Sequence, residues 1–115
     1  LAVSRVHVYL SYPFVLSWSL IEAMSSGCLI VAADTQAVSE VIRDGENGRI
    51  IDFFDRPALV EAVTEALAAP ERFAALRERA RADAVARYDL RSVCLPRLVA
   101  LAEETARLPR PASAP

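Results

Sequence analysis

The chain has 115 residues, of which 54% are hydrophobic, and its formal net charge is −2. A domain of this length buries about two-thirds of its unfolded surface, so the composition predicts one globular domain with a sizeable core. The slight acidity provides no broad basic face for nucleic acid, and the apolar runs are much shorter than the ~20 residues of a membrane span.

The reactive side chains indicate neither a metal centre nor a disulfide framework. Cys28 and Cys94 are far apart, without a CxxC pair or a nearby histidine, so two reduced thiols are expected. His7, the only histidine, falls in an apolar run that suits a strand and is expected to be structural. All 13 basic residues are arginines, which together with abundant alanine favours a bacterial source. We expect a cytoplasmic protein, and peripheral binding of the full-length protein to the inner membrane stays open.

Alternating strand and helix patterns organise the first half of the chain. Three apolar runs, at 6–10, 28–33 and 49–53, are predicted to be strands, and the second is typical of a strand covered on both faces of a parallel sheet. Helices are predicted at 18–26, just before Gly27, and at 38–43. This order predicts an α/β fold in which a parallel sheet of about three strands is flanked by helices.

The second half of the chain is predicted to be helical. A helix capped by Asp55 is followed by helices over about 70–88 and 91–107, and the charges of the 70–88 helix are expected to form a solvated face. The positions expected to face the core are Leu59, Val60, Val63 and Leu67, then Phe73, Leu76, Ala80 and Ala84, and finally Leu95, Leu98 and either Leu101 or Ala102. Residues 109–115, rich in proline, alanine and serine, are predicted to be a disordered tail.

One loop has the residues of a ligand site. Ligands of a parallel sheet bind beyond the carboxyl ends of its strands, where the N-terminal amides of helices attract anions. Ser17, Trp18 and Ser19 stand at a predicted helix start there, and Glu22 follows one turn later. The amides can hold a pyrophosphate and the carboxylate can accept hydrogen bonds from a ribose diol. The S-x-x-E spacing of Ser19 and Glu22 also fits a capping box, so spacing alone leaves both roles of Glu22 open.

The stretch 6–55 resembles the donor-binding half of the group 1 glycosyltransferases, the retaining GT-B family also called family 4. The family pattern combines Glu-x7-Glu, Ala-Met, two small residues and Gly, an apolar strand, a loop glutamate and a D-G-x-N-G turn. It is matched by SWSLIEAMSSGCLIVAAD at 17–34 and SEVIRDGENG at 39–48. By this resemblance Glu22 is the second glutamate of the motif and binds the nucleotide ribose. The same resemblance implies that the backbone amides of Ser17, Trp18 and Ser19 bind the donor diphosphate.

The match has two departures and two residues of secondary interest. Phe14 replaces the leading glutamate, which approaches the donor sugar in the family, so we expect a variant subgroup and count Phe14 among the substrate-binding positions. Gln36 and Ala37 stand where many members have a glycine pair, which predicts a different donor geometry. Glu40 matches the loop glutamate, and a structural brace or cap is its favoured role. The D-G-x-N-G turn is interpreted as purely structural.

The resemblance implies that residues 1–108 are part of a Rossmann-like C-terminal nucleotide-sugar-binding lobe. The implied activity is retaining transfer of a hexosyl group from a UDP-, GDP- or ADP-sugar to an unidentified acceptor, without a cofactor or an essential metal. The start at Leu1 is interpreted as a fragment boundary. The fragment is then expected to be inactive without its N-terminal lobe, and to self-associate. The alternatives are a degenerate GT-B lobe that serves as a binding or assembly module, and another GT-B enzyme such as a sugar-nucleotide epimerase.

Overall fold

A three-stranded parallel sheet forms the centre of the molecule. The computed structural model describes residues 3–12 and 15–108. Its strands are β1 (Val6–Tyr9), β2 (Leu29–Ala33) and β3 (Arg49–Ile51), paired in the order β1-β2-β3. Both pairings are parallel, with Val8 opposite Val31 in the first and Ala32 opposite Ile50 in the second. The predicted α/β fold with a parallel sheet is therefore confirmed.

The strands are shorter than the apolar runs that predicted them, because side chains and turns take over their backbone groups. Asp52 ends β3 two residues early, since its Oδ1 accepts a hydrogen bond from the Phe54 amide at 2.8 Å. Cys28 is not yet part of β2, because its amide donates to the Ala23 carbonyl at 3.0 Å and completes the preceding helix end.

The connection between β1 and β2 contains helix α1 (Trp18–Ser25), close to the predicted 18–26. Gly27 has φ +74°, a left-handed conformation that glycine adopts without strain, and its amide bonds to the Met24 carbonyl at 3.0 Å. The next helix, α2 (Gln36–Ser39), overlaps the predicted 38–43 only at Val38 and Ser39. Further along, the Arg43 amide donates to the Asn47 side chain at 2.7 Å in the turn before β3.

Helix α3 (Arg56–Ala68) begins as predicted, since Asp55 Oδ1 accepts from the Ala58 amide at 2.9 Å. The predicted inward stripe is partly wrong, because Ala62 and Ala66 are the buried residues of this helix, whereas Val60 and Leu67 are exposed. Small alanine side chains let α3 approach the sheet closely. The larger side chains of Val60 and Leu67 are displaced to its flank.

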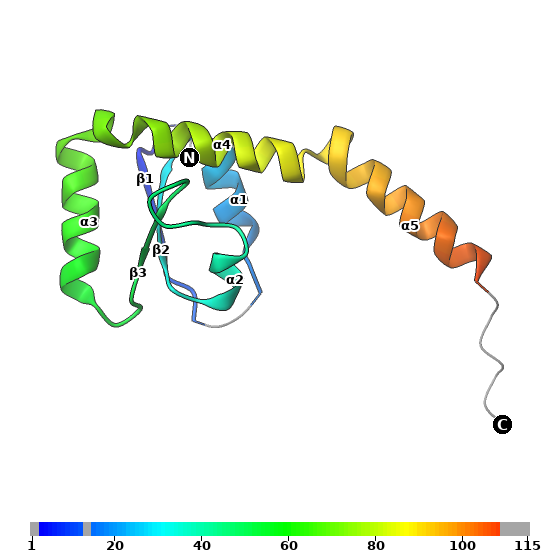
Figure 1. Ribbon diagram of the computed structural model, residues 1–115, viewed down its shortest axis with the longest axis horizontal. Helices are drawn as coiled ribbons and strands as arrows, with labels where there is room; N and C mark the ends of the chain where they lie inside the picture. Colours follow the sequence, from blue (N-terminus) through cyan, green and yellow to red (C-terminus); the bar gives the residue numbers. More distant parts are fainter. Residues whose placement is uncertain (1–2, 13–14, 109–115) are drawn as a thin grey trace, which may run out of the picture.

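A short 3₁₀ turn, η1 (Pro70–Phe73), leads into α4 (Ala74–Tyr88). Phe73, Ala80 and Ala84 are buried and Leu76 is half-buried, so the predicted inner face of this helix is confirmed. Figure 1 shows α4 running along one end of the sheet, from the α3 side to the α1 side.

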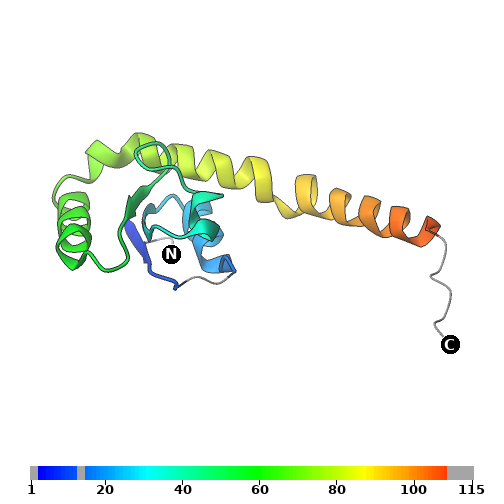
Figure 2. The same cartoon turned by 60° about the horizontal axis from the view of Figure 1, so that its bottom comes forward.

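The last helix differs most from the prediction. A π-helical turn, η2 (Leu90–Cys94), bends the chain after α4, and α5 (Leu95–Arg107) then projects away from the body of the molecule (Figures 1 and 2). No residue of α5 is buried, so the predicted burial of Leu95, Leu98 and either Leu101 or Ala102 is wrong. Within the described residues α5 makes its main contacts with η2, and its apolar side chains Leu95, Leu98, Val99 and Leu101 are exposed.

Helices cover both faces of the sheet and give two apolar cores. On one face, Leu29 and Val31 of β2 pack with Ala62 and Ala66 of α3 and with Phe73. On the other face, alternate residues of β2 pack against α1, α2 and α4; this core contains Cys28, Ile30, Ala32, Leu20, Ala23, Met24, Val38, Ala80 and Ala84. β2 is thus buried on both sides, as its continuous apolar run predicts.

The turn at 44–48 braces the fold. Asn47 is only 1% exposed, and its Nδ2 donates to the Val41 carbonyl at 3.0 Å and to Asp83 Oδ2 at 2.9 Å. Gly45 has φ +73°, whereas Gly48 is needed for space, because a Cβ there would lie 2.8 Å from Ile42 Cγ2. These contacts support the structural interpretation of the D-G-x-N-G turn.

Both cysteines have structural environments. Buried Cys28 donates from Sγ to the Ser4 carbonyl at 3.3 Å, and half-buried Cys94 donates to the Tyr88 carbonyl at 3.5 Å. No disulfide joins them. His7 is half-buried beside Tyr9, with 6.4 Å between the ring centroids, and burial lowers the pKa of its imidazole below 6.5. Its buried Nε2 has no hydrogen-bond partner among the described residues.

Candidate donor site at the start of helix α1

The start of α1 lies at the carboxyl end of β1, where the fold places ligands. The N-cap is Ser17, whose Oγ accepts from the Ser19 amide at 3.2 Å and lies 3.1 Å from Ser19 Oγ. Its carbonyl accepts from the Leu20 amide at 3.1 Å. Two serine hydroxyls and the positive end of the helix dipole are therefore brought together at this point.

Trp18 contributes a helix-start amide that has no partner among residues 3–12 and 15–108. The amides of Ser17, Ser19 and Leu20 all donate within the chain. An unpaired N–H at a helix start is suited to bind an anion oxygen. Trp18 as a whole is 80% exposed.

Glu22 lies on the second turn of α1 and is exposed. Its carboxylate makes no hydrogen bond or ion pair within the described part of the chain. Together with Trp18 it lines a hollow of about 280 Å³ between α1, the end of α4 and η2; the other lining residues are Ile21, Ser25, Ala84, Val85, Tyr88, Asp89 and Leu90. The carboxylate is thus available to accept hydrogen bonds from a hydroxylated ligand.

The capping-box hypothesis for Glu22 is wrong in its register. The helix is capped by Ser17, two residues before the predicted cap Ser19. Glu22 is therefore the fifth helical residue rather than the third, and its carboxylate does not return to the cap amide.

The other residues singled out in the sequence are Glu40, Gln36, Ala37 and Phe14, and the first three, which the structure describes, are not among the residues that line the hollow beside Glu22. Glu40 is exposed and ends α2 as its C-cap residue, with its carbonyl 3.5 Å from both terminal nitrogens of Arg87. Gln36 and Ala37 form the first turn of α2. Phe14 lies outside the described residues. No cluster of three metal-ligating side chains occurs in the segments 3–12 and 15–108.

The arginines of α4, predicted to form only a solvated face, hold the other end of α1. Arg77 Nε donates to the Gly27 carbonyl at 2.7 Å, and Arg81 donates to the Ser25 carbonyl. These guanidinium groups satisfy carbonyls that a helix end leaves unpaired. The C-terminal end of α1 is therefore anchored to α4. The only sequence signal for these contacts is the spacing of Arg77 and Arg81, which places both arginines on one face of α4.

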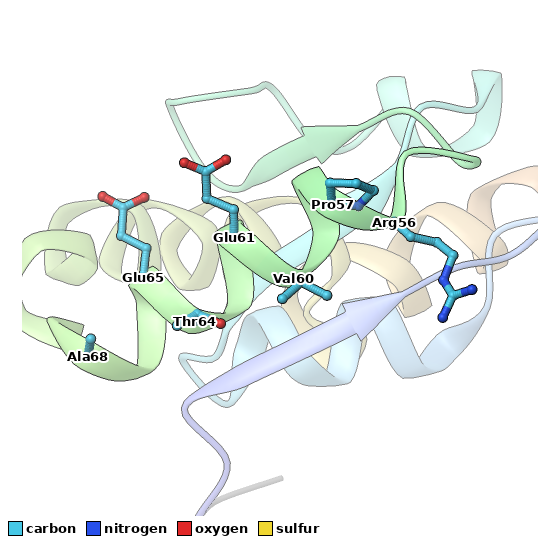
Figure 3. A pocket seen from close by; sticks show the side chains of 7 residues that line it. All are labelled: Arg56, Pro57, Val60, Glu61, Thr64, Glu65 and Ala68. Carbon is cyan, nitrogen blue, oxygen red and sulfur yellow. The ribbon is translucent and has the colours of Figure 1, made fainter.

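A larger hollow of about 770 Å³ lies on the opposite face of the sheet, along α3. Figure 3 shows Val60 on the side of α3 toward β1, whereas Glu61 and Glu65 point away from the strand. β1 is an edge strand of the described sheet. Val8 on β1 is 41% exposed and Val60 on α3 is 63% exposed. This apolar groove lies apart from α1 and is not the candidate donor site.

The fold is a parallel α/β domain, a class in which phosphorylated ligands commonly bind at a helix start. The sequence matches the family Glycosyl transferases group 1 over residues 2–83. The chain therefore belongs to the group 1 glycosyltransferases. A phosphatidyl-myo-inositol mannosyltransferase of Mycobacterium leprae (strain TN) is 44% identical over 73 residues, which are 61% of this chain and 18% of that protein.

Solved structures agree on the fold of a GT-B lobe. Anabaena HepE in complex with UDP-glucose is similar with a TM-score of 0.79 at 22% identity, covering 93% of this chain and 29% of that chain. Sucrose-phosphate synthase from Thermosynechococcus elongatus is similar with a TM-score of 0.78 at 23% identity, and the match covers 90% of this chain and 26% of that chain. The chain thus spans less than a third of each relative. Within the described residues, no helix has both the length and the apolar character needed to cross a membrane.

Proposed function

We propose that residues 1–108 are part of the donor-binding C-terminal lobe of a hexosyltransferase. This enzyme would move a sugar from a nucleotide diphosphate to an unidentified acceptor, with retention of configuration and no essential metal, in the bacterial cytoplasm. The observation that carries the proposal is the position of Glu22: it lies in the part of the chain that matches the family and presents an unpaired carboxylate one turn from the helix start.

The site divides the donor between two groups of atoms. The Trp18 amide and the hydroxyls of Ser17 and Ser19 take the diphosphate, because hydrogen-bond donors at a helix start favour anions. Glu22 takes the ribose hydroxyls, because a carboxylate accepts two hydrogen bonds from a diol. The relatives support a sugar-nucleotide donor, since the Anabaena protein was solved with UDP-glucose and the Mycobacterium leprae protein is a mannosyltransferase.

The departures from the family pattern limit what this lobe does to the sugar. Phe14 provides no carboxylate where the leading glutamate of the motif approaches the sugar. We therefore assign the chain to a variant subgroup in which other residues hold the hexose. Gln36 and Ala37 add side chains in place of a glycine pair, so the sugar lies further from the backbone of α2.

The short span relative to the matched proteins supports the interpretation that the chain is a fragment. A parallel sheet is normally covered on its faces and continued at its edges, whereas here β1 is an edge strand of the described sheet and the groove along α3 is open. We propose that further strands of the same lobe fill that groove and that the N-terminal lobe supplies the acceptor site. The isolated chain would then have no transferase activity.

Calorimetric titration of the intact two-lobed protein with UDP, GDP and ADP tests the proposal, with the matching nucleosides as controls for the diphosphate. We expect saturable binding of at least one nucleoside diphosphate, and weaker binding of its nucleoside. Absence of binding by all three would favour the alternative that this lobe is a degenerate binding or assembly module. Incubation with a sugar nucleotide tests the other alternative, a sugar-nucleotide epimerase, which predicts epimerisation of the bound sugar without transfer.

A further inference from the structure

Tyr9 links the core to the start of α1. It is the last residue of β1 and only 6% exposed, and its ring packs in the core that also contains Leu20 and Met24 of α1. Its hydroxyl oxygen accepts a hydrogen bond from the Ser17 amide at 2.9 Å. A buried side chain therefore fixes the residue that caps the helix, across a separation of eight residues.

This bond takes one helix-start amide out of reach of a ligand. With the Ser17 amide held by Tyr9, and the Ser19 and Leu20 amides held by Ser17, the Trp18 amide remains as a helix-start donor without a partner in the described chain. Without the phenol oxygen, the Ser17 amide would lose its acceptor and the cap residue its tether to β1. The first turn of α1 would then be free to shift.

We infer that Tyr9 is a positioning residue for the diphosphate end of the donor site, acting through the Ser17 amide; this inference rests on the proposed function. The effect is confined to the first turn, because the far end of α1 is anchored by Arg77 and Arg81. Leu20 and Met24 also hold the helix body in the core. Glu22 should therefore keep its place when the Tyr9 hydroxyl is removed.

The test compares Tyr9→Phe with Tyr12→Phe in the intact two-lobed protein. Both variants lose one phenol oxygen, but Tyr12 is 70% exposed, its ring contacts Phe53, and the Ser17 amide bonds to Tyr9 instead. For Tyr9→Phe we expect the dissociation constant of the nucleoside diphosphate to rise about fivefold to tenfold, and that of the nucleoside to change less than about twofold. Tyr12→Phe should change neither constant.

Amide hydrogen exchange gives a second readout that needs no ligand. The Ser17 amide should exchange about tenfold faster in Tyr9→Phe, while the amides of the second turn of α1 keep their protection. Unchanged exchange at Ser17, or equal weakening of the diphosphate and the nucleoside, would overturn the positioning role. Failure of the unmodified protein to bind any nucleoside diphosphate would instead refute the proposed function, and with it this inference.

Discussion

Asn47 donates a hydrogen bond from Nδ2 to Asp83 Oδ2 at 2.9 Å, which joins the turn before β3 to helix α4. The same side chain bonds to the backbone of Val41 and Arg43. Asn47→Ala should lower the free energy of unfolding by about 2–3 kcal/mol, because it leaves buried backbone groups without partners. Chemical denaturation of the chain measures this.

Glu46→Ala is the matched control, since Glu46 lies in the same turn and its ion pair with Arg43 is solvent-exposed. It should cost less than about 1 kcal/mol. An equal loss in both variants would mean that the turn is not braced by Asn47.

The two glycines of this turn should respond differently to substitution. A Cβ at Gly48 would lie 2.8 Å from Ile42 Cγ2 and 3.3 Å from the Ile30 carbonyl oxygen, so Gly48→Ala should cost about 1–3 kcal/mol through overpacking. Gly45 has open space but φ +73°, so Gly45→Asn should cost less than about 1 kcal/mol, because asparagine tolerates this conformation. Thermal unfolding of both variants checks the order, and a more harmful Gly45→Asn would reverse the assignment.

His7 should make the fold less stable in mild acid. Burial lowers its pKa in the folded chain below the ordinary 6.5, so the unfolded chain binds the proton more readily. The contribution of neutral His7 to the free energy of unfolding is complete above pH 6.5, and it is lost as the pH falls toward the lowered pKa of the folded chain. Melting temperatures at pH 7.5 and 5.5 should therefore differ more for the wild type than for His7→Gln. Equal pH dependence in both would exclude His7 as the cause.

The open edge beside α3 predicts self-association of the isolated chain. Val8 and Val60 expose apolar surface there, and the edge of β1 leaves backbone groups unpaired. Light scattering should show oligomers at high concentration, and Val8→Lys should reduce them. A monomeric wild type would count against the fragment interpretation. Loss of oligomers in Val99→Lys, but not in Val8→Lys, would locate the contact on α5 instead.

The sequence predicted those parts of the fold that depend on local patterns and continuous burial. The apolar run of β2, the Asp55 cap and the glycine after α1 were all interpreted correctly, because each acts within a few residues. The outward projection of α5 was not predictable, because its apolar face has the same sequence pattern as that of a buried helix. The pattern does not reveal whether another element packs against that face. Tyr9 was missed for a related reason, because a tyrosine in a strand does not indicate the distant amide that its hydroxyl binds.

The sequence predicted which candidate residues stand at the start of α1, but it misplaced the helix cap, and their role as a donor site stays a prediction. Ser17, Trp18, Ser19 and Glu22 do gather at the start of α1, whereas the S-x-x-E spacing placed the cap at Ser19. Two serines two residues apart can each cap a helix, and the sequence does not reveal that the Ser17 amide bonds to Tyr9 while the Ser17 hydroxyl bonds to the Ser19 amide.

Glu22 provides the most direct test of the donor site. Hydrogen bonds to a carboxylate contribute roughly 1.5–3 kcal/mol, so Glu22→Ala in the intact protein should weaken nucleoside diphosphate binding about tenfold to a hundredfold. Glu22→Gln should recover part of the loss, and Glu61→Ala in the groove beside α3 should leave binding unchanged. Calorimetric titration of the three variants measures these affinities. Wild-type affinity in a well-folded Glu22→Ala protein would contradict the assigned ribose contact.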